Sequence, residues 1–334
     1  MKLLVTGGAG FIGSEFVRMT LRTYPSDEVV VLDKLTYAGN RANLASVEHD
    51  PRFRFVQGDI SDRDLVHDIA GTVDVIVNFA AESHVDRSIA EPANFVRENI
   101  NGVINLLETV RKSGNEPSII QIGTDEEYGD IISGSFSEDD ILKPSSPYSA
   151  SKASSSLIAL SYYRTYGMKI MVTRTSNNFG RYQFPEKLRP KTIIRNYLNM
   201  EIPLYGNGNN KRDWIYVDDN VRAVLTVLTN GKSGEIYNIS ANNELSNIEI
   251  VNKIFDTMNK KGKIKYVSDR PGHDVRYSIN SEKLSKLGWR PEYNFEDALK
   301  LTVKWYINNK DWWTKLIEKN NNILSEEPWK IKWN

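Results

Sequence analysis

The sequence predicts an α/β protein with a doubly wound parallel sheet, followed by a smaller C-terminal α+β region. Up to about residue 175, short β-branched runs alternate with longer amphipathic stretches. These runs are apolar on both faces, which is typical of parallel strands covered by helices above and below. After about residue 176, loops rich in Asn, Gly and Pro interrupt the alternation. We therefore expect two domains, residues 1–175 and 176–334, with segments of the second free to return to the first.

The first domain supplies six expected strands, with helices between them. The strands are Lys2–Thr6, Val29–Asp33, Phe53–Gln57, Val73–Phe79, Ser118–Gly123 and Lys169–Arg174. Helices are expected at Phe11–Tyr24 and Phe95–Lys112, and in the second of these apolar residues recur at three- and four-residue steps. Another helix is expected over residues 148–166, because Ser146 suits the N-cap and Pro147 the first helical position.

The second domain is expected to be smaller and less regular. Its short strands are predicted at Ile202–Tyr205, Ile236–Ile239 and Ile264–Val267, with loops at 177–190 and 206–212. Five tryptophans lie in the tail: Trp305, Trp312, Trp313, Trp329 and Trp333. No apolar helix flanks them, so we interpret them as packing anchors rather than a membrane-interface belt.

The composition excludes several kinds of chemistry. The chain has no Cys, which rules out disulfides, thiolate metal sites and a Cys nucleophile. Its four His are scattered without a short ligand pair, so we expect no metal. With 43 basic and 43 acidic residues, the net charge is zero and offers no global field for nucleic acid or anionic lipid. We find no signal peptide and no long apolar run, and therefore expect a cytoplasmic protein without a membrane partner.

The first expected strand ends in a glycine turn. Gly7, Gly10 and Gly13 are spaced GxxGxxG, which suits a tight turn, close approach to a pyrophosphate, and helix packing on a strand. A strand-to-helix turn can also need glycine for steric reasons alone. Asp33, however, ends the second strand, where a carboxylate can accept hydrogen bonds from both adenosine ribose hydroxyls. Because Asp33 would repel a 2′-phosphate, the pattern favours NAD over NADP.

Two groups of polar residues suggest catalysis. Tyr148 and Lys152 are four residues apart and share a helix face, where an ammonium would lower the tyrosine pKa and make it a base. Alone, the pair also fits a packed ring and a solvated amine. Thr124, Asp125 and Glu126 follow a parallel strand, where open α/β sheets place active sites. Neighbouring carboxylates resist double ionisation and can provide an acid and a base, although an acidic loop can also be a solvated turn.

The glycine turn and the YxxxK pair resemble those of the short-chain dehydrogenase/reductase superfamily, in particular its extended branch, which acts on nucleotide sugars. The motifs Asn78–Ser88, Thr124–Glu126, Arg174–Gly180, Phe184–Leu188, Arg212–Trp214 and Asp269–Asp274 resemble, in this order, those of the dTDP-glucose 4,6-dehydratases. The Thr-Asp-Glu triplet is the discriminating piece, since related epimerases and decarboxylases have a Ser or a single Glu there, and CDP-glucose dehydratases have a Lys. The resemblance implies a Rossmann-type NAD-binding domain and a homodimer formed through helices near 95–112 and 148–166.

The resemblance also implies a reaction, the conversion of dTDP-glucose to dTDP-4-keto-6-deoxyglucose. Tyr148, helped by Lys152 and Thr124, would take the O4 proton during oxidation at C4. Glu126 would take the C5 proton, and protonated Asp125 would protonate the departing C6 hydroxyl before hydride returns to C6. A UDP-glucose 4,6-dehydratase, a 4-epimerase, a UDP-glucuronate decarboxylase and an inactive NAD-binding regulatory protein remain alternatives.

The binding residues that the resemblance implies fall into two sets. Those expected at NAD are Gly7, Gly10, Phe11, Ile12, Gly13, Asp33, Lys34, Leu35, Thr36, Asp59, Ile60, Phe79, Ala80, Ala81, Ser83, Glu98, Tyr148, Lys152 and Asn178. Those expected at the nucleotide sugar are Ser83, Thr124, Asn177, Lys187, Leu188, Pro203, Tyr205, Arg212, Asn247, Arg270 and His273, with Arg212 as the diphosphate clamp. The chain departs from the family pattern at Gly123, usually Ser, at Glu127, a Val in the DEVYG form, and at Glu98, often Thr or Asn. Glu127 is expected either to alter the Asp125 pKa or to face solvent.

Overall fold

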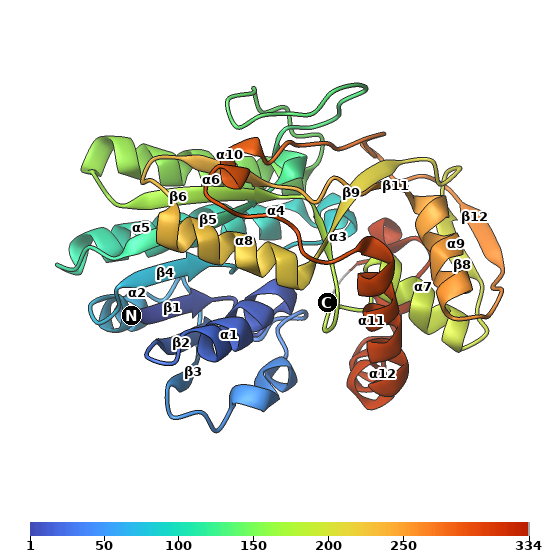
Figure 1. Ribbon diagram of the computed structural model, residues 1–334, viewed down its shortest axis with the longest axis horizontal. Helices are drawn as coiled ribbons and strands as arrows, with labels where there is room; N and C mark the ends of the chain where they lie inside the picture. The colour runs from blue at the N-terminus through green and yellow to red at the C-terminus, as the bar shows by residue number, and fades with distance from the viewer. Residues whose placement is uncertain (333–334) are drawn as a thin grey trace.

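A computed structural model describes residues 1–332 and is built around a seven-stranded parallel sheet of order β10-β6-β5-β4-β1-β2-β3 (Figure 1). This architecture confirms the predicted doubly wound fold. The strands are β1 (Lys2–Thr6), β2 (Glu28–Asp33), β3 (Phe53–Gln57), β4 (Val75–Asn78), β5 (Ser118–Thr124), β6 (Ile170–Thr175) and β10 (Ile236–Ile239). On β1, Leu4 lies opposite Val30 of β2 on one side and Ile76 of β4 on the other. The strand order therefore reverses between β1 and β4, and this switch point opens a crevice at the carboxyl ends of the strands.

Helices cover both faces of the sheet. One face carries α1 (Phe11–Thr23) and α8 (Val217–Asn230), and the other carries α2 (Arg63–Ala70), α5 (Gly102–Lys112) and α6 (Pro147–Tyr166). Side chains alternate between two cores along β1. Leu3 and Val5 pack toward α1 and α8, whereas Leu4 packs toward α2, α5 and α6. The sheet is thus buried on both sides, which leaves its carboxyl edge for the site.

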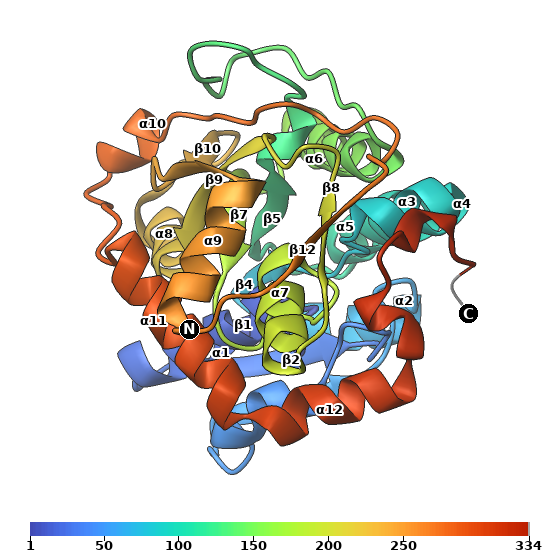
Figure 2. The same ribbon diagram turned by 90° about the vertical axis from the view of Figure 1, so that its right-hand side faces the viewer.

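Residues of the second half form two small sheets and most of the remaining helices. One sheet has the order β11-β9-β7, with β7 (Asn177–Phe179), β9 (Lys211–Tyr216) and β11 (Glu244–Ser246), and the other pairs β8 (Ile202–Tyr205) with β12 (Ile264–Val267). The helices here are α7 (Leu188–Tyr197), α9 (Asn247–Thr257), α10 (Glu282–Ser285), α11 (Phe295–Asn308) and α12 (Lys310–Lys319). In Figure 2, α7, α9, α11 and α12 face the viewer. They lie on the side of the molecule that is on the right in Figure 1, away from the amino ends of the central strands.

Shorter helical segments connect these elements. They are α3 (Val85–Ala90), α4 (Pro92–Phe95), the π-helical η2 (Val96–Asn101), and the 3₁₀ segments η1 (Arg41–Val47), η3 (Asp125–Glu127), η4 (Asn321–Leu324) and η5 (Pro328–Lys330). The helix expected at 95–112 therefore begins as a π-helical stretch. A π-helical turn is often found at a functional site.

Most predicted strands have the observed bounds or differ from them by one or two residues. Two loop predictions were wrong, because β7 lies within 177–190 and β9 begins at Lys211, within 206–212. The residues of these strands are too polar to show the apolar pattern of a strand. β10 pairs with β6 in the main sheet, and α8 covers that sheet. We still propose two domains divided at residue 175. In this proposal β10 and α8, which come after residue 175, belong to the first domain in space.

Four of the tail tryptophans pack against other aromatic rings. Trp305 lies 4.6 Å from the ring of Tyr182, and Trp329 lies 4.7 Å from the ring of Tyr205. Trp312 and Trp313 contact Tyr306 and Tyr197, respectively. This confirms these four as packing anchors, while Trp333 lies outside the described residues.

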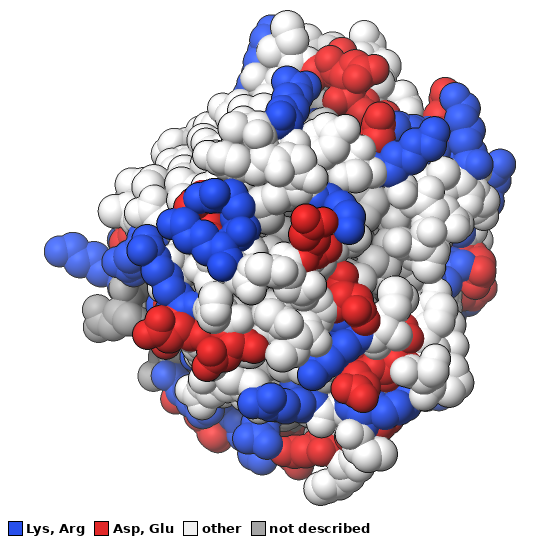
Figure 3. All heavy atoms as spheres, turned by 90° about the vertical axis from the view of Figure 1, so that its left-hand side faces the viewer, with Lys and Arg blue, Asp and Glu red and all other residues white. Residues whose placement is uncertain are grey.

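The surface carries charges of both signs. On the face in Figure 3, basic and acidic side chains are interleaved. Within residues 1–332, no helix has the length and apolar character needed to span a membrane.

Candidate active site

The turn between β1 and α1 forms a cradle that requires glycine. Gly7 has a φ of +66°, and a Cβ at this position would lie 2.6 Å from Ala80 N. A Cβ on Gly13 would lie 2.5 Å from the Gly7 carbonyl oxygen. Helix α1 begins after Gly10 without a side-chain cap, so its first N–H groups and its dipole can bind an anion. The cradle therefore fits the pyrophosphate of NAD.

Asp33 lies at the carboxyl end of β2, beside this cradle. Its two carboxylate oxygens accept hydrogen bonds from Ala9 N and Leu35 N, each at 2.8 Å. Each oxygen keeps a further lone pair, so the carboxylate can also accept bonds from ribose hydroxyls. Burial raises the Asp33 pKa. The arrangement fits an adenosine ribose without a 2′-phosphate.

A charged cluster borders the expected adenosine position. Lys34 Nζ lies 2.7 Å from Asp59 Oδ2 and 3.4 Å from Glu98 Oε1. Glu98, which departs from the family pattern, therefore lies at the cavity and pairs with the Lys34 ammonium. Burial is the largest single effect on the Asp59 pKa and would raise it. The opposing effects, led by the hydrogen bond from Lys34, outweigh burial, so the Asp59 pKa is lowered. Leu35 does not line the cavity. Its side chain packs against the hydrophobic core, which differs from its predicted place at the cofactor.

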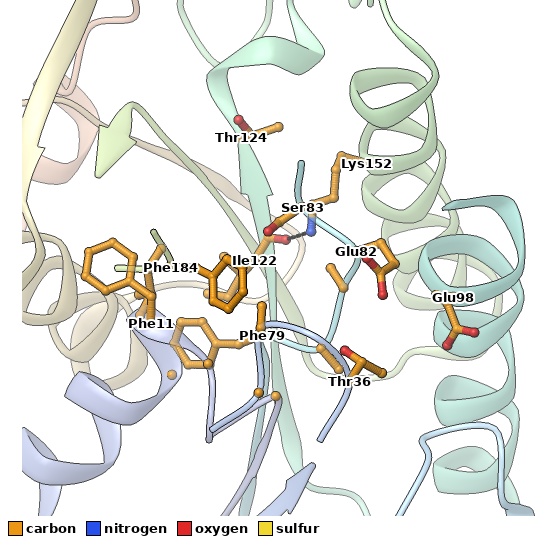
Figure 4. A pocket seen from close by; sticks show the side chains of 18 of the residues that line it. Phe11, Thr36, Phe79, Glu82, Ser83, Glu98, Ile122, Thr124, Lys152 and Phe184 are labelled. Carbon is orange, nitrogen blue, oxygen red and sulfur yellow. Dashed lines mark hydrogen bonds between the residues drawn. The ribbon is translucent and has the colours of Figure 1, made fainter. Parts of the chain in front are cut away.

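The carboxyl ends of the strands surround a cavity of about 300 Å³. Apart from Leu35, it is lined by all the residues expected at NAD and by all five expected catalytic residues. Residues of its wall that the sequence reasoning missed include Leu32, Ala38, Gly39, Gly58, Glu82, Ile122, Thr175, Ser176, Gln183, Phe184 and Glu186. In Figure 4, Phe11, Phe79 and Phe184 lie on one side of the cavity, while Thr124 and Lys152 lie near its far end. The glycines and aromatic residues among them could have been suspected from the sequence. The others reach the cavity from distant parts of the chain, and no local sequence pattern marks them.

Strand β5 and helix α6 bring the expected catalytic side chains together. Thr124 ends β5 and caps η3, and its Oγ1 lies 3.2 Å from Asp125 Oδ1. Helix α6 starts at Pro147 after a capping box made by Ser146 and Ser149, as the N-cap prediction required. Tyr148 and Lys152 therefore lie in its first two turns, facing β5. Lys152 Nζ donates to the Ile122 carbonyl at 2.5 Å, the contact drawn in Figure 4.

The ionisation of Tyr148 differs from the expectation. Burial raises its pKa well above the usual value, and the negative charge of Glu126 raises it further. A hydrogen bond with the Thr124 side chain acts in the opposite direction. Burial also lowers the Lys152 pKa to about 8. The prediction that Lys152 lowers the Tyr148 pKa was therefore wrong for this structure, because the Lys152 ammonium is directed to the Ile122 carbonyl.

The surroundings of Asp125 and Glu126 separate their ionisation. Burial raises the Asp125 pKa well above its usual value, and the charge of Glu126 raises it further, as expected for neighbouring carboxyls. Burial also raises the Glu126 pKa, but the charges of Arg270, Arg212 and Lys187 oppose that rise. Within the described part of the chain, Asp125 Oδ2 and Glu126 Oε2 are buried without a hydrogen-bond partner. These atoms are available to a substrate.

A second cavity of about 150 Å³ adjoins the first, and Glu126, Asn177, Glu186 and Lys187 line both. The remaining residues expected at the nucleotide sugar line the second cavity: Leu188, Pro203, Tyr205, Arg212, Asn247, Arg270 and His273. The sequence reasoning missed other residues of its wall, namely His84, Val85, Asp86, Lys191, Leu204 and Trp214.

The cations of this second cavity are held by carbonyls and carboxylates. Arg212 donates to the Asp274 carbonyl at 2.8 Å, and Arg270 pairs with Asp86 at 3.0 Å. Asp86 also accepts a 2.9 Å hydrogen bond from Tyr205 Oη. Arg270 Nε is buried and has no hydrogen-bond partner among residues 1–332, which fits a bound diphosphate. Arg270 is thus at least as well placed as Arg212 for the role of clamp.

The comparisons with known proteins agree with this geometry. Residues 4–302 match the family model described as GDP-mannose 4,6 dehydratase. The low-salt glycan biosynthesis protein Agl12 of Haloferax volcanii is 50% identical over 312 residues, which cover 93% of this chain and 100% of Agl12. A dTDP-glucose 4,6-dehydratase of Streptomyces niveus is 46% identical over 322 residues, which cover 95% of this chain and 96% of that protein.

A solved structure extends the likeness to the fold. The crystal structure of DesIV, a dTDP-glucose 4,6-dehydratase from Streptomyces venezuelae with NAD and TYD bound, has a TM-score of 0.93 and is 49% identical. The match covers 95% of this chain and 100% of that one. The chain therefore belongs to the GDP-mannose 4,6-dehydratase family of extended short-chain dehydrogenase/reductases, and its relatives there include dTDP-glucose 4,6-dehydratases.

Proposed function

We propose that this protein is an NAD-dependent dTDP-glucose 4,6-dehydratase, which forms dTDP-4-keto-6-deoxyglucose and water. The observation that carries the proposal is the pair of buried carboxyls, Asp125 and Glu126, beside Tyr148 and Lys152 where the two cavities meet. The larger cavity fits NAD, and the smaller one presents cations to a nucleoside diphosphate. The sugar between them would then lie at the carboxyl pair.

Each catalytic side chain has a defined task in this reaction. Bound NAD supplies the hydride acceptor for C4 and later the hydride donor for C6. Tyr148 would take the proton from O4 in its phenolate form, which the positive charge of the nicotinamide ring of NAD would favour against the effect of burial, while Thr124 hydrogen-bonds to the tyrosine. Glu126 takes the proton from C5, and Asp125 protonates the C6 hydroxyl, so that the C6–O bond breaks and water leaves. A proton then returns to C5, and the sum of the steps is the loss of one water with no net consumption of NAD.

The electrostatics support this division of roles between the carboxyls. Asp125 is held in its protonated form by burial and by its neighbour's charge, which suits an acid. Glu126 faces three cations that favour its carboxylate, which suits a base. A 4-epimerase needs only oxidation and reduction at C4, so this acid and base would have no task in one.

The direct test is to incubate the purified protein with dTDP-glucose and, in parallel, with UDP-glucose. We expect dTDP-glucose to lose the mass of one water and to give the alkali-developed absorbance of a 4-keto sugar, without added NAD if the cofactor is retained. Faster turnover of UDP-glucose would move the assignment to a UDP-glucose 4,6-dehydratase. If neither donor loses water, even with NAD added, the proposed function is wrong.

We further propose a cytoplasmic homodimer that pairs through α5 and α6. The support is the exposure of apolar side chains on α6: Leu157 in the middle of the helix is 56% exposed, and Tyr166 at its C-terminal end, beside Arg111 of α5, is 51% exposed. Apolar side chains exposed along one helix are typical of a helix that packs in a bundle across a two-fold axis.

A further inference from the structure

Glu127 is a buried carboxylate behind the catalytic turn, and it lines neither cavity. The expectation that it could face solvent was wrong, since its side chain is fully buried. Its carboxylate fills space that Gly123 leaves open: a Cβ at Gly123 would lie only 2.4 Å from Glu127 Oε1. The two departures from the family pattern are therefore coupled, because the larger residue at 127 requires the smaller one at 123.

The contacts of Glu127 connect it to the catalytic turn and to helix α6. Its Oε1 accepts hydrogen bonds from Thr124 N at 3.1 Å and from Ser156 Oγ at 3.0 Å. Its Oε2 pairs with Arg174 Nε at 2.8 Å, which satisfies the charge of both buried groups. Arg174 in turn donates to Tyr128 Oη at 2.8 Å. Glu127 thus closes the capping box that holds Thr124 in place.

From this geometry, and on the basis of the proposed function, we infer that Glu127 is a positioning residue, which anchors Thr124 and supplies the negative charge that supports the Lys152 ammonium. It touches neither cavity, so it acts through these two residues. Gly123 is required for this role of Glu127, because the absence of a side chain at position 123 provides the space for the Glu127 carboxylate.

The charge of Glu127 acts on both members of the Tyr-Lys pair. It raises the Lys152 pKa against the effect of burial, and it raises the Tyr148 pKa together with Glu126 and Asp125. Among residues 1–332, Glu127 is the charged group that raises the Lys152 pKa. The other charged residues on the elements packed against α6 are Asp86, Arg87, Arg97, Glu98, Glu108, Arg111, Lys112, Asp125, Glu126 and Arg174. Removing the carboxylate should therefore lower both pKa values.

The first test is the pH dependence of dehydration by the NAD-loaded enzyme, comparing the wild type with Glu127→Gln. We expect kcat to fall roughly 10- to 100-fold with little change in KM, because the catalytic turn is displaced while the substrate contacts remain. Both limits of the kcat/KM profile should move to lower pH by about one unit. An active variant whose pH limits are unchanged would overturn the inference.

A second variant covers the case in which the single substitution prevents folding. Glu127→Gln leaves Arg174 buried without its partner, so Glu127→Gln/Arg174→Met removes both charges and should show the same pH shift. The matched control is Glu15→Gln, since Glu15 is also buried, pairs with Arg181 at 2.6 Å and lines neither cavity. The control should lose stability without any shift of the pH limits. A shift in the control equal to that in the Glu127 variants would overturn the inference.

A double-mutant cycle tests the packing of the Glu127 carboxylate against Gly123 without measuring catalytic activity. Gly123→Ala should lower the thermal midpoint more in the wild-type chain than in a Glu127→Val chain, where the clash with the carboxylate is absent. The contact of the new Cβ with the Thr173 carbonyl is common to both backgrounds and cancels. If Glu127→Val does not fold, the cycle is run with Arg174→Met in all four chains. If Gly123→Ala lowers the thermal midpoint by the same amount in both backgrounds, the coupling of Gly123 and Glu127 is wrong. A wild type that dehydrates neither donor would instead reject the proposed function.

Discussion

Asp125 and Glu126 are adjacent in the chain, but they have different electrostatic surroundings. Asp125 is 2% exposed and hydrogen-bonds only to the Thr124 hydroxyl, whereas Glu126 faces the cations of the substrate cavity. Burial raises the pKa of both carboxyls, but the nearby cations oppose that rise more strongly at Glu126, so Asp125 is the better acid and Glu126 the better base. The sequence predicted the pair and its location at the strand end. It could not predict which cations, from residues 187, 212 and 270, would lie near Glu126.

Glu126→Gln tests the role of this residue as the base. We expect C4 oxidation to survive, because Thr124, Tyr148 and Lys152 remain in place, while elimination falls about 10²- to 10⁴-fold with the loss of a general base. The measurement is a single turnover followed by the absorbance of the reduced cofactor and by exchange of the C5 hydrogen with deuterated solvent. An equal loss of oxidation and elimination would contradict the assignment.

Asp125→Asn tests the protonation of the acid through the stability of the protein. Because the folded-state pKa is raised above 3.8, the usual pKa of an Asp side chain, the folded protein holds a proton that the unfolded chain releases. The contribution of Asp125 to stability is therefore present at low pH and is lost as the pH rises toward the folded-state pKa. The Asn variant avoids this loss, so its relative stability should rise by about 1.4 kcal/mol per pH unit over that range.

Chemical denaturation at pH 5 and pH 8 measures this effect. Asp140→Asn serves as the control without a pH-dependent change, because hydrogen bonds from Ser137 lower the Asp140 pKa and keep its titration below this pH range. The contribution of Asp140 is complete above its unfolded-state pKa of 3.8, so the relative stability of Asp140→Asn should be the same at both pH values, while that of the Asp125 variant rises. A gain for Asp125→Asn that is the same at both pH values would show that its carboxyl is not protonated by the fold.

At the scale of elements, the sequence predicted what is encoded by local pattern. The bounds of β3 follow from the alternation of Phe53 and Phe55 with Arg54, and the start of α6 follows from an N-cap followed by Pro147. β9 was missed because Arg212 and Asp213 are buried in it. Asp213 accepts hydrogen bonds from the backbone at 241 and 243, so its burial depends on a segment about 30 residues away. No pattern within β9 reports that partner.

The π-helical segment η2 was missed for a similar reason. Its few apolar residues, Val96 and Ile100, continue toward the regular apolar steps of α5, so the pattern predicts one ordinary α-helix; the five-residue step from Phe95 to Ile100 is the only local sign of the wider turn. In the structure, Asn99 of this segment donates to Ser151 Oγ on α6 and accepts from Glu82 N at the cavity wall. The extra residue in the turn brings Asn99 to both partners, and these contacts exist only after the sheet has formed.

At the scale of the molecule, the site depends on parts of the chain that are far apart in sequence. Asp86 from the first half of the chain pairs with Arg270 from the second half and accepts a hydrogen bond from Tyr205, whose ring packs against Trp329. The sequence predicted Arg270 and Tyr205 only through resemblance, and Asp86 was not assigned. The second half of the chain therefore positions the substrate cations against anchors that the first half provides.

The proposed homodimer gives the last prediction, which concerns the assembly of the whole molecule. Leu157→Glu places a charge on the exposed apolar surface of α6, where the two copies would bring their α6 helices together. We expect the variant to be monomeric at concentrations at which the wild type is dimeric, because an unpaired charge cannot be buried between the helices. Leu301→Glu on α11 is the matched control, since Leu301 is 47% exposed outside α5 and α6, and it should remain dimeric. Sedimentation velocity decides the outcome, and either a monomeric wild type or a dimeric Leu157→Glu variant would exclude pairing through α6.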